Sequence, residues 1–197
     1  MSRTEIRLTG FGGQGIILSG YIIGKAAAIH DKKQATFTQS YGPESRGGAC
    51  SAQVIISDEL VSYPQVIAPS IQIVMSQEAY SKYAPTLRDG ALLIVDEDLV
   101  ETDDLPDGVR LLCVPATRLA EEMGRKIVAN IVMLGFFAAV TDVVSVEAVR
   151  EAVRSSVPKG TEEFNLKAFE KGYEYGMANS EWQIIRNPKS EIRNPKM

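Results

Sequence analysis

The chain has 197 residues, 45% of them hydrophobic and 23% charged, which is the composition of an ordinary globular protein with a substantial core. Its 21 Lys and Arg residues and 25 Asp and Glu residues give a formal net charge of −4, which argues against binding to nucleic-acid phosphates. With 1 histidine and 2 cysteines, the chain lacks the roughly four ligands of a usual zinc site and the roughly four thiolates of an iron–sulfur cluster.

The cysteines and the apolar segments indicate the compartment. Cys50 and Cys113 lie far apart and form no C-x-x-C pattern, which suits a reducing environment. The first ten residues contain no apolar run of signal-peptide length. The most apolar stretch, 127–140, is shorter than the roughly 18 residues that span a bilayer. We therefore expect a cytoplasmic protein that binds neither membranes nor nucleic acid.

The first half of the chain predicts alternating strands and helices. In chain order we expect a strand at 6–9, a glycine loop at 10–15, a helix at 16–29, and strands at 35–38, 52–56, 71–75, 91–95 and 111–114. An antiparallel hairpin between 52–56 and 60–62 is an option. Within 16–29, Gly20, Gly24 and Ala28 form a bare stripe that lets the helix lie close to a sheet. This pattern predicts an α/β fold: an open, mostly parallel Rossmann-like sheet with helices on both faces.

The second half predicts mainly helices. Segment 126–140 is apolar nearly all round and is expected to be buried in the domain or under a partner. Helix caps are expected at Ser76, Ser145 and Thr161, and the last of these helices has Leu166, Phe169, Tyr173 and Met177 on one face. Residues 1–180 are predicted to form one domain. Residues 181–197, with a repeated Ile-Arg-Asn-Pro-Lys, are predicted to be a disordered tail.

The glycine loop, Gly10–Gly15, fits G-x-G-x-x-G between a strand and a helix. Its glycines allow a tight turn, and the helix that follows offers free N–H groups to an anion. A dinucleotide site of this type expects an acidic residue at the end of the second strand, where this chain has Thr38, Gln39 and Ser40. A phosphate-binding loop and a simple tight turn both remain open.

A second loop, Tyr41–Gly48, reads YGPESRGG and follows the second predicted strand. The carboxyl ends of parallel strands meet at one edge of a sheet, so we expect this loop to lie near the glycine loop, where α/β proteins bind ligands. Arg46 could bind a carboxylate or phosphate, and Glu44 could orient it. The alternative is a polar turn without a ligand.

Three segments, GFGGQGIILSG, YGPESRGGACSAQVIIS and KIVANIVMLG, occur in the order typical of one family. They resemble the gamma subunit of 2-oxoacid:ferredoxin oxidoreductases, in particular its 2-oxoglutarate (ketoglutarate) branch; pyruvate and ketoisovalerate enzymes contain related gamma-type domains. The resemblance covers Ile6 to about Met177. It implies the conversion of 2-oxoglutarate, coenzyme A and oxidised ferredoxin into succinyl-CoA, CO₂ and reduced ferredoxin.

The resemblance also implies a division of labour. Thiamine diphosphate with Mg and the iron–sulfur clusters are expected on partner subunits, namely alpha and beta, with a delta or ferredoxin-like subunit as a further candidate. Ferredoxin is reached through the complex. This chain is expected to hold no cofactor alone, to lack catalytic and metal-binding residues of its own, and to be inactive alone. It is expected to cover the thiamine diphosphate site and to help bind coenzyme A, a co-substrate, or the substrate anion.

The motif positions give candidate residues that face the ligand or the active site: Gly12, Gly13, Gln14, Gly15, Tyr41, Gly42, Glu44, Arg46, Gly47, Gly48 and Asn130. For Asn130, a core amide satisfied by backbone groups is an equal alternative. Two other functions stay open: the beta-type subunit of an indolepyruvate oxidoreductase, and a stand-alone nucleotide-binding module.

Overall fold

The structure is a computed structural model that describes residues 3–40, 49–102, 105–106 and 108–179. Its strands are β1 (Arg3–Phe11), β2 (Gln34–Gln39), β3 (Ala49–Ser57), β4 (Ile71–Val74), β5 (Leu92–Asp96) and β6 (Arg110–Val114). Its helical segments are α1 (Ile16–Lys25), η1 (Ala26–His30), α2 (Gln77–Tyr83), η3 (Ala84–Thr86), α3 (Ala116–Glu122), η4 (Lys126–Val128), α4 (Ala129–Val140), α5 (Val146–Arg154) and α6 (Glu162–Asn179). The predicted tail, 181–197, lies outside the described residues and stays a prediction.

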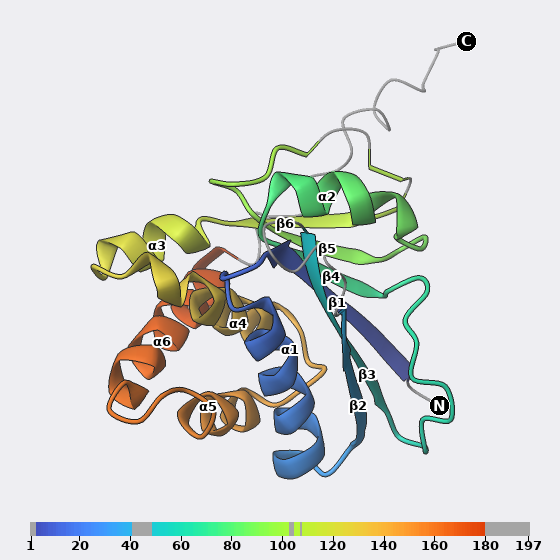
Figure 1. Cartoon of the computed structure of the whole chain (residues 1–197), viewed down its shortest axis with the longest axis horizontal. Coiled ribbons are helices and arrows are strands. Elements are labelled where there is room, and N and C mark those ends of the chain that lie inside the picture. Colours follow the sequence, from blue (N-terminus) through green and yellow to red (C-terminus); the bar gives the residue numbers. More distant parts are fainter. Residues whose placement is uncertain (1–2, 41–48, 103–104, 107, 180–197) are drawn as a thin grey trace.

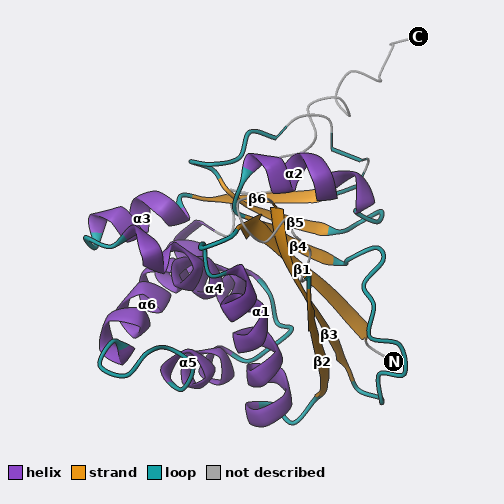
Figure 2. Ribbon diagram, in the orientation of Figure 1, coloured by secondary structure: helices purple, strands orange, loops and turns teal. Residues whose placement is uncertain are grey.

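The described strands form one sheet in the order β2-β3-β1-β4-β5-β6 (Figures 1 and 2). β1, β4, β5 and β6 pair in parallel, whereas β3 runs antiparallel to β1 and β2. All strands except β3 therefore share one direction, which confirms the mostly parallel sheet. The optional hairpin between 52–56 and 60–62 is wrong, because β3 pairs with β2 and β1 and the described residues 60–62 form no strand.

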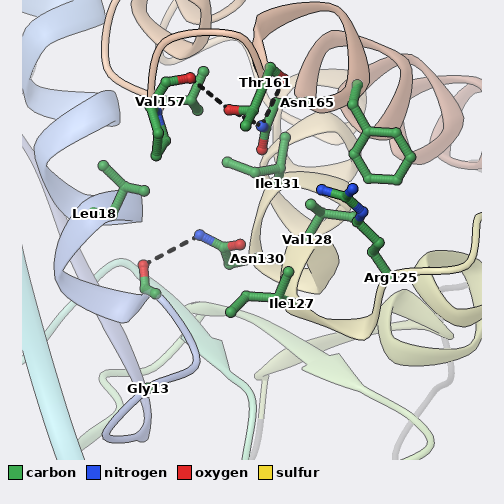
Figure 3. A pocket seen from close by; sticks show the side chains of 13 residues that line it. Gly13, Leu18, Arg125, Ile127, Val128, Asn130, Ile131, Val157, Thr161 and Asn165 are labelled. Atoms are coloured by element: carbon green, nitrogen blue, oxygen red, sulfur yellow. Dashed lines mark hydrogen bonds between the residues drawn. The ribbon is translucent and has the colours of Figure 1, made fainter.

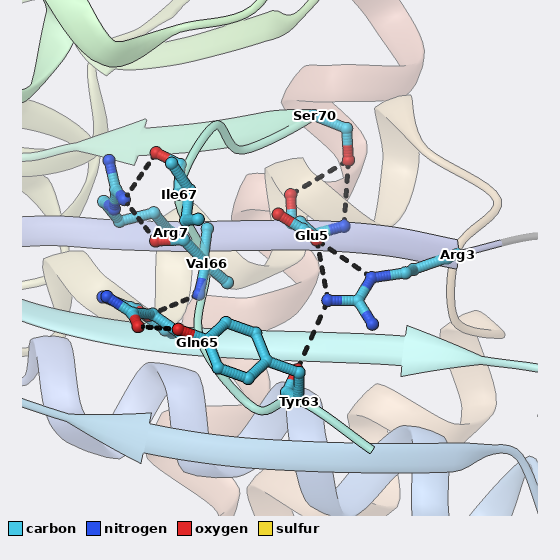
Figure 4. A network of polar contacts seen from close by, with 9 residues as sticks. Arg3, Glu5, Arg7, Tyr63, Gln65, Val66, Ile67 and Ser70 are labelled. Atoms are coloured by element: carbon cyan, nitrogen blue, oxygen red, sulfur yellow. Dashed lines mark hydrogen bonds and ion pairs between the residues drawn. The ribbon is translucent and has the colours of Figure 1, made fainter. Parts of the chain in front are cut away.

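The strap, as we call residues 58–70, connects β3 to β4 and lies against the sheet (Figure 4). Side chains of the sheet bind its backbone: the Val66 N–H donates to Gln53 Oε1 (3.0 Å), and Arg7 Nη2 donates to the carbonyl oxygens of Val66 (2.8 Å) and Ile67 (3.2 Å). These contacts replace a strand ladder, which explains why the strap is irregular. Burial lowers the pKa of the Arg7 guanidinium.

Helices cover both faces of the sheet, as predicted (Figure 1). α1 and the C-terminal helices form one core with the sheet, and α2 packs on the other face. A Cβ added at Gly20 would lie 2.7 Å from the Ala52 Cβ and 3.0 Å from the Phe37 ring, so α1 lies on β2 and β3 as the bare stripe predicts. A Cβ added at Gly24 would lie 3.6 Å from the Phe37 Cβ, which is an ordinary van der Waals distance.

Most of the apolar segment is buried within the chain itself, but Ile127 at its start is 75% exposed. In α4, residues 129–138 are all buried, and α6 lies across this helix. The backbones meet at two glycines, because a Cβ at Gly172 would overlap the carbonyl oxygen of Val132, and one at Gly135 would overlap that of Phe169. Among the described residues, no helix is long and apolar enough to cross a membrane.

Two expectations for α6 are wrong in detail. Met177 is 55% exposed. The face that is buried consists of Asn165, Ala168, Phe169, Gly172 and Gly176, because the close approach of α4 selects small residues. Thr161 does precede the first residue of α6, and its carbonyl accepts from the Asn165 N–H (3.0 Å). Its hydroxyl, however, donates to the Pro158 carbonyl (2.7 Å) and accepts from the Asn165 amide (3.1 Å), and among the described residues it accepts from no backbone N–H.

The other two caps are confirmed. The Ser76 hydroxyl accepts a hydrogen bond from the Ala79 N–H at the start of α2, and the Ser145 hydroxyl accepts one from the Ala148 N–H at the start of α5, each at 3.3 Å. Both helices thus begin with a side-chain acceptor for one of their free N–H groups.

Candidate functional site

The glycine loop forms the sharp turn between β1 and α1. The Gln14 N–H donates to the Phe11 carbonyl (3.2 Å), and α1 starts directly after Gly15. Gly13 and Gly15 have φ angles of +99° and +73°, a region that other residues rarely adopt. The turn therefore favours glycine at both positions, whether or not it binds a ligand.

The side chain of Gln14 holds this turn against the neighbouring strand. Its Oε1 accepts from the Phe11 N–H (2.6 Å), and its Nε2 donates to the carbonyl oxygen of Met75, directly after β4 (2.7 Å). β1 and β4 are adjacent strands. The chain leaves β1 into α1 on one face of the sheet and leaves β4 into α2 on the other face, so the Gln14 bridge lies at the point where such folds bind ligands. In this structure, Gln14 positions the glycine turn.

Replacing Gln14 with glutamate tests this bridge. A carboxylate can still accept from the Phe11 N–H, but it places a second acceptor against the Met75 carbonyl. We expect the free energy of unfolding to fall by about 1–3 kcal/mol at neutral pH, measured by urea denaturation. Gln77→Glu is the matched control, because Gln77 also bonds one backbone N–H and one C=O, both of Glu101, at an exposed site. Equal losses in the two variants would contradict the bridging role.

Asn130 joins the glycine turn from α4. Its Nδ2 donates to the Gly15 carbonyl and to the Ser19 hydroxyl, both at 3.3 Å, and the residue is 4% exposed. A Cβ on Gly15 would lie 2.8 Å from Asn130 Cγ, so the two residues are in close contact. The structure thus brings the first and third motifs together. Asn130 is bound to backbone, as one alternative expected, and it also borders a cavity, as the other requires.

Two cavities flank the glycine turn. The first, of about 350 Å³, lies between α1, α4 and the start of α6 (Figure 3), and its lining residues are Gly13, Gly15, Leu18, Arg125, Ile127, Val128, Asn130, Ile131, Val157, Pro158, Thr161, Phe164 and Asn165. The second, of about 420 Å³, lies between α1 and the ends of β2 and β3, and its lining residues are Phe11, Gly12, Gly13, Gly15, Ile16, Ile17, Leu18, Gln39, Ser40 and Cys50. Gly13, Gly15 and Leu18 line both cavities. The glycine turn and the first turn of α1 therefore separate the two cavities and form their common rim.

Arg125 is a site residue that the sequence analysis missed. It is exposed at the rim of the first cavity, with its guanidinium carbon 5.2 Å from the centre of the Phe164 ring (Figure 3). It precedes the apolar segment without any motif around it, and its place on this cavity depends on the packing of α4 beside α1. It puts a positive charge on the side of the cavity away from Gly13 (Figure 3).

The second loop lies outside the described residues, and so do its candidates Tyr41, Gly42, Glu44, Arg46, Gly47 and Gly48. The residues that flank it are described. Gln39 pairs with Ala52 in the β2–β3 ladder, and Ala49 pairs with Phe11 in the β3–β1 ladder. Both ends of the loop therefore reach the sheet edge that carries the glycine turn, as the sequence predicts, although β3 is antiparallel. Roles for the loop residues stay predictions.

A buried carboxylate stands further along the same edge. Asp96, at the end of β5, accepts hydrogen bonds from the Thr117 N–H (3.1 Å), the Thr117 hydroxyl (2.6 Å) and the Asp98 N–H (3.3 Å). Burial raises the pKa of Asp96, and these hydrogen bonds act in the opposite direction. With all its contacts directed at backbone and Thr117, Asp96 fixes the start of α3.

Comparison with known proteins adds independent information. The family model for pyruvate ferredoxin/flavodoxin oxidoreductase matches residues 5–175. The 2-oxoglutarate synthase subunit KorC of Methanocaldococcus jannaschii is 56% identical over 174 residues, which are 87% of this chain and 93% of that protein.

Two solved structures are similar along most of this chain. The gamma subunit of a keto/oxoacid ferredoxin oxidoreductase from Geobacter sulfurreducens has a TM-score of 0.80 and 45% identity, covering 90% of this chain and 98% of that chain. The 2-oxoglutarate:ferredoxin oxidoreductase from Magnetococcus marinus, with 2-oxoglutarate, coenzyme A and succinyl-CoA bound, has a TM-score of 0.82 and 26% identity, covering 90% of this chain and 32% of that chain.

Proposed function

Because this chain belongs to the pyruvate ferredoxin/flavodoxin oxidoreductase family, we propose that it is a subunit of a 2-oxoglutarate:ferredoxin oxidoreductase. The observation that carries the substrate is the 56% identity to a 2-oxoglutarate synthase subunit over nearly the full length of both proteins. The complex would convert 2-oxoglutarate, coenzyme A and oxidised ferredoxin into succinyl-CoA, CO₂ and reduced ferredoxin.

The cofactors of this reaction belong, in our proposal, to the alpha and beta subunits and to a delta or ferredoxin-like subunit. The donor set of this chain does not fit an iron–sulfur cluster, because Cys50 lies on β3 and Cys113 on β6, at positions separated by three strands. Burial raises the pKa of both thiols, which disfavours the thiolate that a metal requires. The described residues contain no group of three or more His, Cys, Asp or Glu that could hold a metal ion.

The contribution we propose for this chain is to cover the thiamine diphosphate site and to bind an anionic group of coenzyme A at the glycine turn. α1 begins without a side-chain cap, unlike α2 and α5, so within the described part of the chain its first N–H groups have no side-chain acceptor. Those groups and the positive end of the helix dipole favour an anion. Arg125 adds a charge to the cavity that Gly13 and Gly15 also line, and Arg46 is expected to approach from the second loop.

The two cavities suit a long ligand with phosphates near its middle. Both border the first turn of α1, and apolar side chains such as Leu18, Ile131 and Phe164 make up most of the first cavity. Coenzyme A has an aromatic base at one end and a thiol arm at the other, joined through phosphates. In our proposal the phosphates lie over the glycine turn between the cavities.

Steady-state kinetics of the reconstituted complex test this assignment. We expect Arg125→Ala to raise the KM for coenzyme A about tenfold, because the variant loses one charged contact to that ligand. The KM for 2-oxoglutarate should change little. Arg46→Ala is expected to impair turnover that depends on coenzyme A or on the 2-oxoacid. Arg118→Ala is the control, because Arg118 is an exposed arginine paired with Glu97 and Asp98. Unchanged kinetics for Arg125→Ala and Arg46→Ala with both ligands varied would contradict the anion-binding role.

The substrate has its own test. Purified alone, the chain is expected to give no turnover, whereas the complex isolated from its source should oxidise 2-oxoglutarate in preference to aryl 2-oxoacids. Preference for indolepyruvate would replace the proposed substrate. If the chain is a stable monomer that binds a nucleotide and no other subunit co-purifies with it, the alternative of a stand-alone nucleotide-binding module would replace the whole proposal.

A further inference from the structure

The strap exposes several large apolar side chains. Leu60, Tyr63 and Ile67 are 81%, 56% and 69% exposed. Single exposed apolar side chains are common on protein surfaces, but these three belong to one short segment. An extended chain advances by at most about 3.6 Å per residue, so Tyr63 lies within about 14 Å of each of the other two. The three side chains therefore fall within the area of one protein–protein contact.

The backbone that carries these side chains is fixed to the sheet. Arg7 is 5% exposed, and its Nη2 donates to the carbonyl oxygens of Val66 and Ile67. Further along, the Ser70 N–H donates to the Glu5 carbonyl (2.8 Å), and the Ser70 hydroxyl accepts from the Glu5 N–H (3.0 Å). Figure 4 shows the strap crossing β1 and β3 at these contacts. A segment held in this way loses little conformational entropy when a partner binds it.

The strap turns its larger apolar side chains outward. Only smaller ones, such as Val66 and Pro69, are buried. Because the sheet lies on one side of the strap, the exposed Leu60, Tyr63 and Ile67 point away from the sheet. A strap of residues 58–70 is also longer than the roughly 2–6 residues of most connections, and ordered loops of this length usually have a function. These features indicate a contact surface.

We propose that two copies of this chain associate through their straps, which run antiparallel around a twofold axis at Tyr63. Leu60 precedes Tyr63 by three residues and Ile67 follows it by four, so Leu60 of each copy lies against Ile67 of the other. The two Tyr63 rings lie at the centre of the interface, where tyrosine is enriched among the residues that dominate binding. The same surface is used on both copies, as in other twofold dimers.

The charge pattern favours a second copy as the occupant. No Asp, Glu, Lys or Arg occurs from Leu60 to Gln77, so two straps meet without repulsion, and a strongly charged partner would find no opposite charge on the strap. Beside Tyr63, Arg3 and Glu5 form an ion pair with each other (2.9 Å). A standard interface buries about 800 Å² on each partner, and three apolar side chains supply only its centre. We therefore expect a weak dimer.

The strap starts far from the glycine turn. It follows Ser57, which pairs with Arg3, whereas Ala49 at the other end of β3 pairs with Phe11, beside the glycine turn. The strap thus leaves the sheet at the edge opposite the two cavities. Two copies joined through their straps keep the edge proposed for coenzyme A clear of the interface. The dimer does not depend on the proposed function, because it is tested on this chain alone.

Sedimentation equilibrium of the full chain tests the dimer. We expect a dissociation constant in the micromolar range, and Ile67→Lys should raise it more than about tenfold, because it places a charge against Leu60 of the second copy. The melting temperature of the monomer should stay unchanged, since the side chain is exposed. Ile29→Lys, at a residue of η1 that is 55% exposed, is the matched control. A chain that stays monomeric up to about 0.5 mM, or equal effects of the two variants, would overturn the proposal.

Mixtures of variants test which side chains meet. Leu60→Lys and Ile67→Glu should each weaken the dimer. Together they form one Lys–Glu pair across the axis and keep one natural Leu60–Ile67 contact. This mixed dimer should be about fivefold tighter than that of Leu60→Lys with Ile67→Lys, which opposes two lysines. Equal association of the two mixtures would contradict the antiparallel arrangement. Protection of the strap from hydrogen exchange only when other subunits are added would assign it to a different partner and would also overturn the proposal.

Discussion

Gly172→Ala is expected to lower the free energy of unfolding by about 3 kcal/mol or more, the upper range for overpacking a core. The added methyl group would overlap the Val132 carbonyl of α4 and lie 3.1 Å from the Phe136 nitrogen, and both neighbours are backbone. The helices must separate to admit it. Helix propensity alone predicts the opposite sign, because alanine in a helix is favoured over glycine by roughly 0.5–1 kcal/mol.

Urea denaturation of the full chain measures this difference. Lys167→Ala is the matched control, because it also introduces alanine into α6 at an exposed position and is expected to change stability by less than about 0.5 kcal/mol. Gly135→Ala, which would overlap the Phe169 carbonyl from the other helix, should resemble Gly172→Ala. A Gly172→Ala protein as stable as the parent would show that the helices do not cross as closely as the structure has them.

The glycines of α1 and α6 show which close contacts could be predicted from the sequence. The spacing of Gly20 and Gly24 indicated a close helix–sheet contact, which the structure confirms at Gly20. The equivalent role of Gly172 and Gly176 was missed, because the apolar spacing from Leu166 to Met177 suggested a face of large side chains. A hydrophobic pattern reports which residues avoid water, and it contains no information on how near the neighbouring backbone comes.

The candidate site, like the helix contacts, could be predicted from the sequence only in part. Residues joined by short segments, such as those of the glycine turn, could be placed because the strand–turn–helix pattern is local. The contact of Asn130 with Gly15, and the presence of Arg125 on the same cavity as the turn, arise from packing between segments more than 100 residues apart. For Gln14 the motif did not indicate that both ends of the side-chain amide bind backbone, and its role facing the ligand stays a prediction.

Gly15→Ala is expected to have the largest effect on turnover of the complex, a loss of about 100-fold, the order that a misplacement of about 1 Å causes. Alanine at φ +73° is strained, and its methyl group would displace the Asn130 amide from the Gly15 carbonyl and the Ser19 hydroxyl. The first turn of α1 and the rim shared by the two cavities would shift together. Turnover by the reconstituted complex and urea denaturation of the chain measure the two consequences.

Gly13→Ala separates strain from contact. Gly13 also has a positive φ, +99°, but a Cβ there meets nothing within 4 Å, so this variant adds the strain alone, about 1–2 kcal/mol. In a chain that already carries Asn130→Ala, Gly15→Ala should then cost no more stability than Gly13→Ala. The coupling energy between positions 15 and 130, obtained from the double-mutant cycle, is the part due to their contact. Equal losses for Gly15→Ala with and without Asn130 would mean that backbone strain accounts for the glycine, and Asn130 would lose its role in shaping the turn.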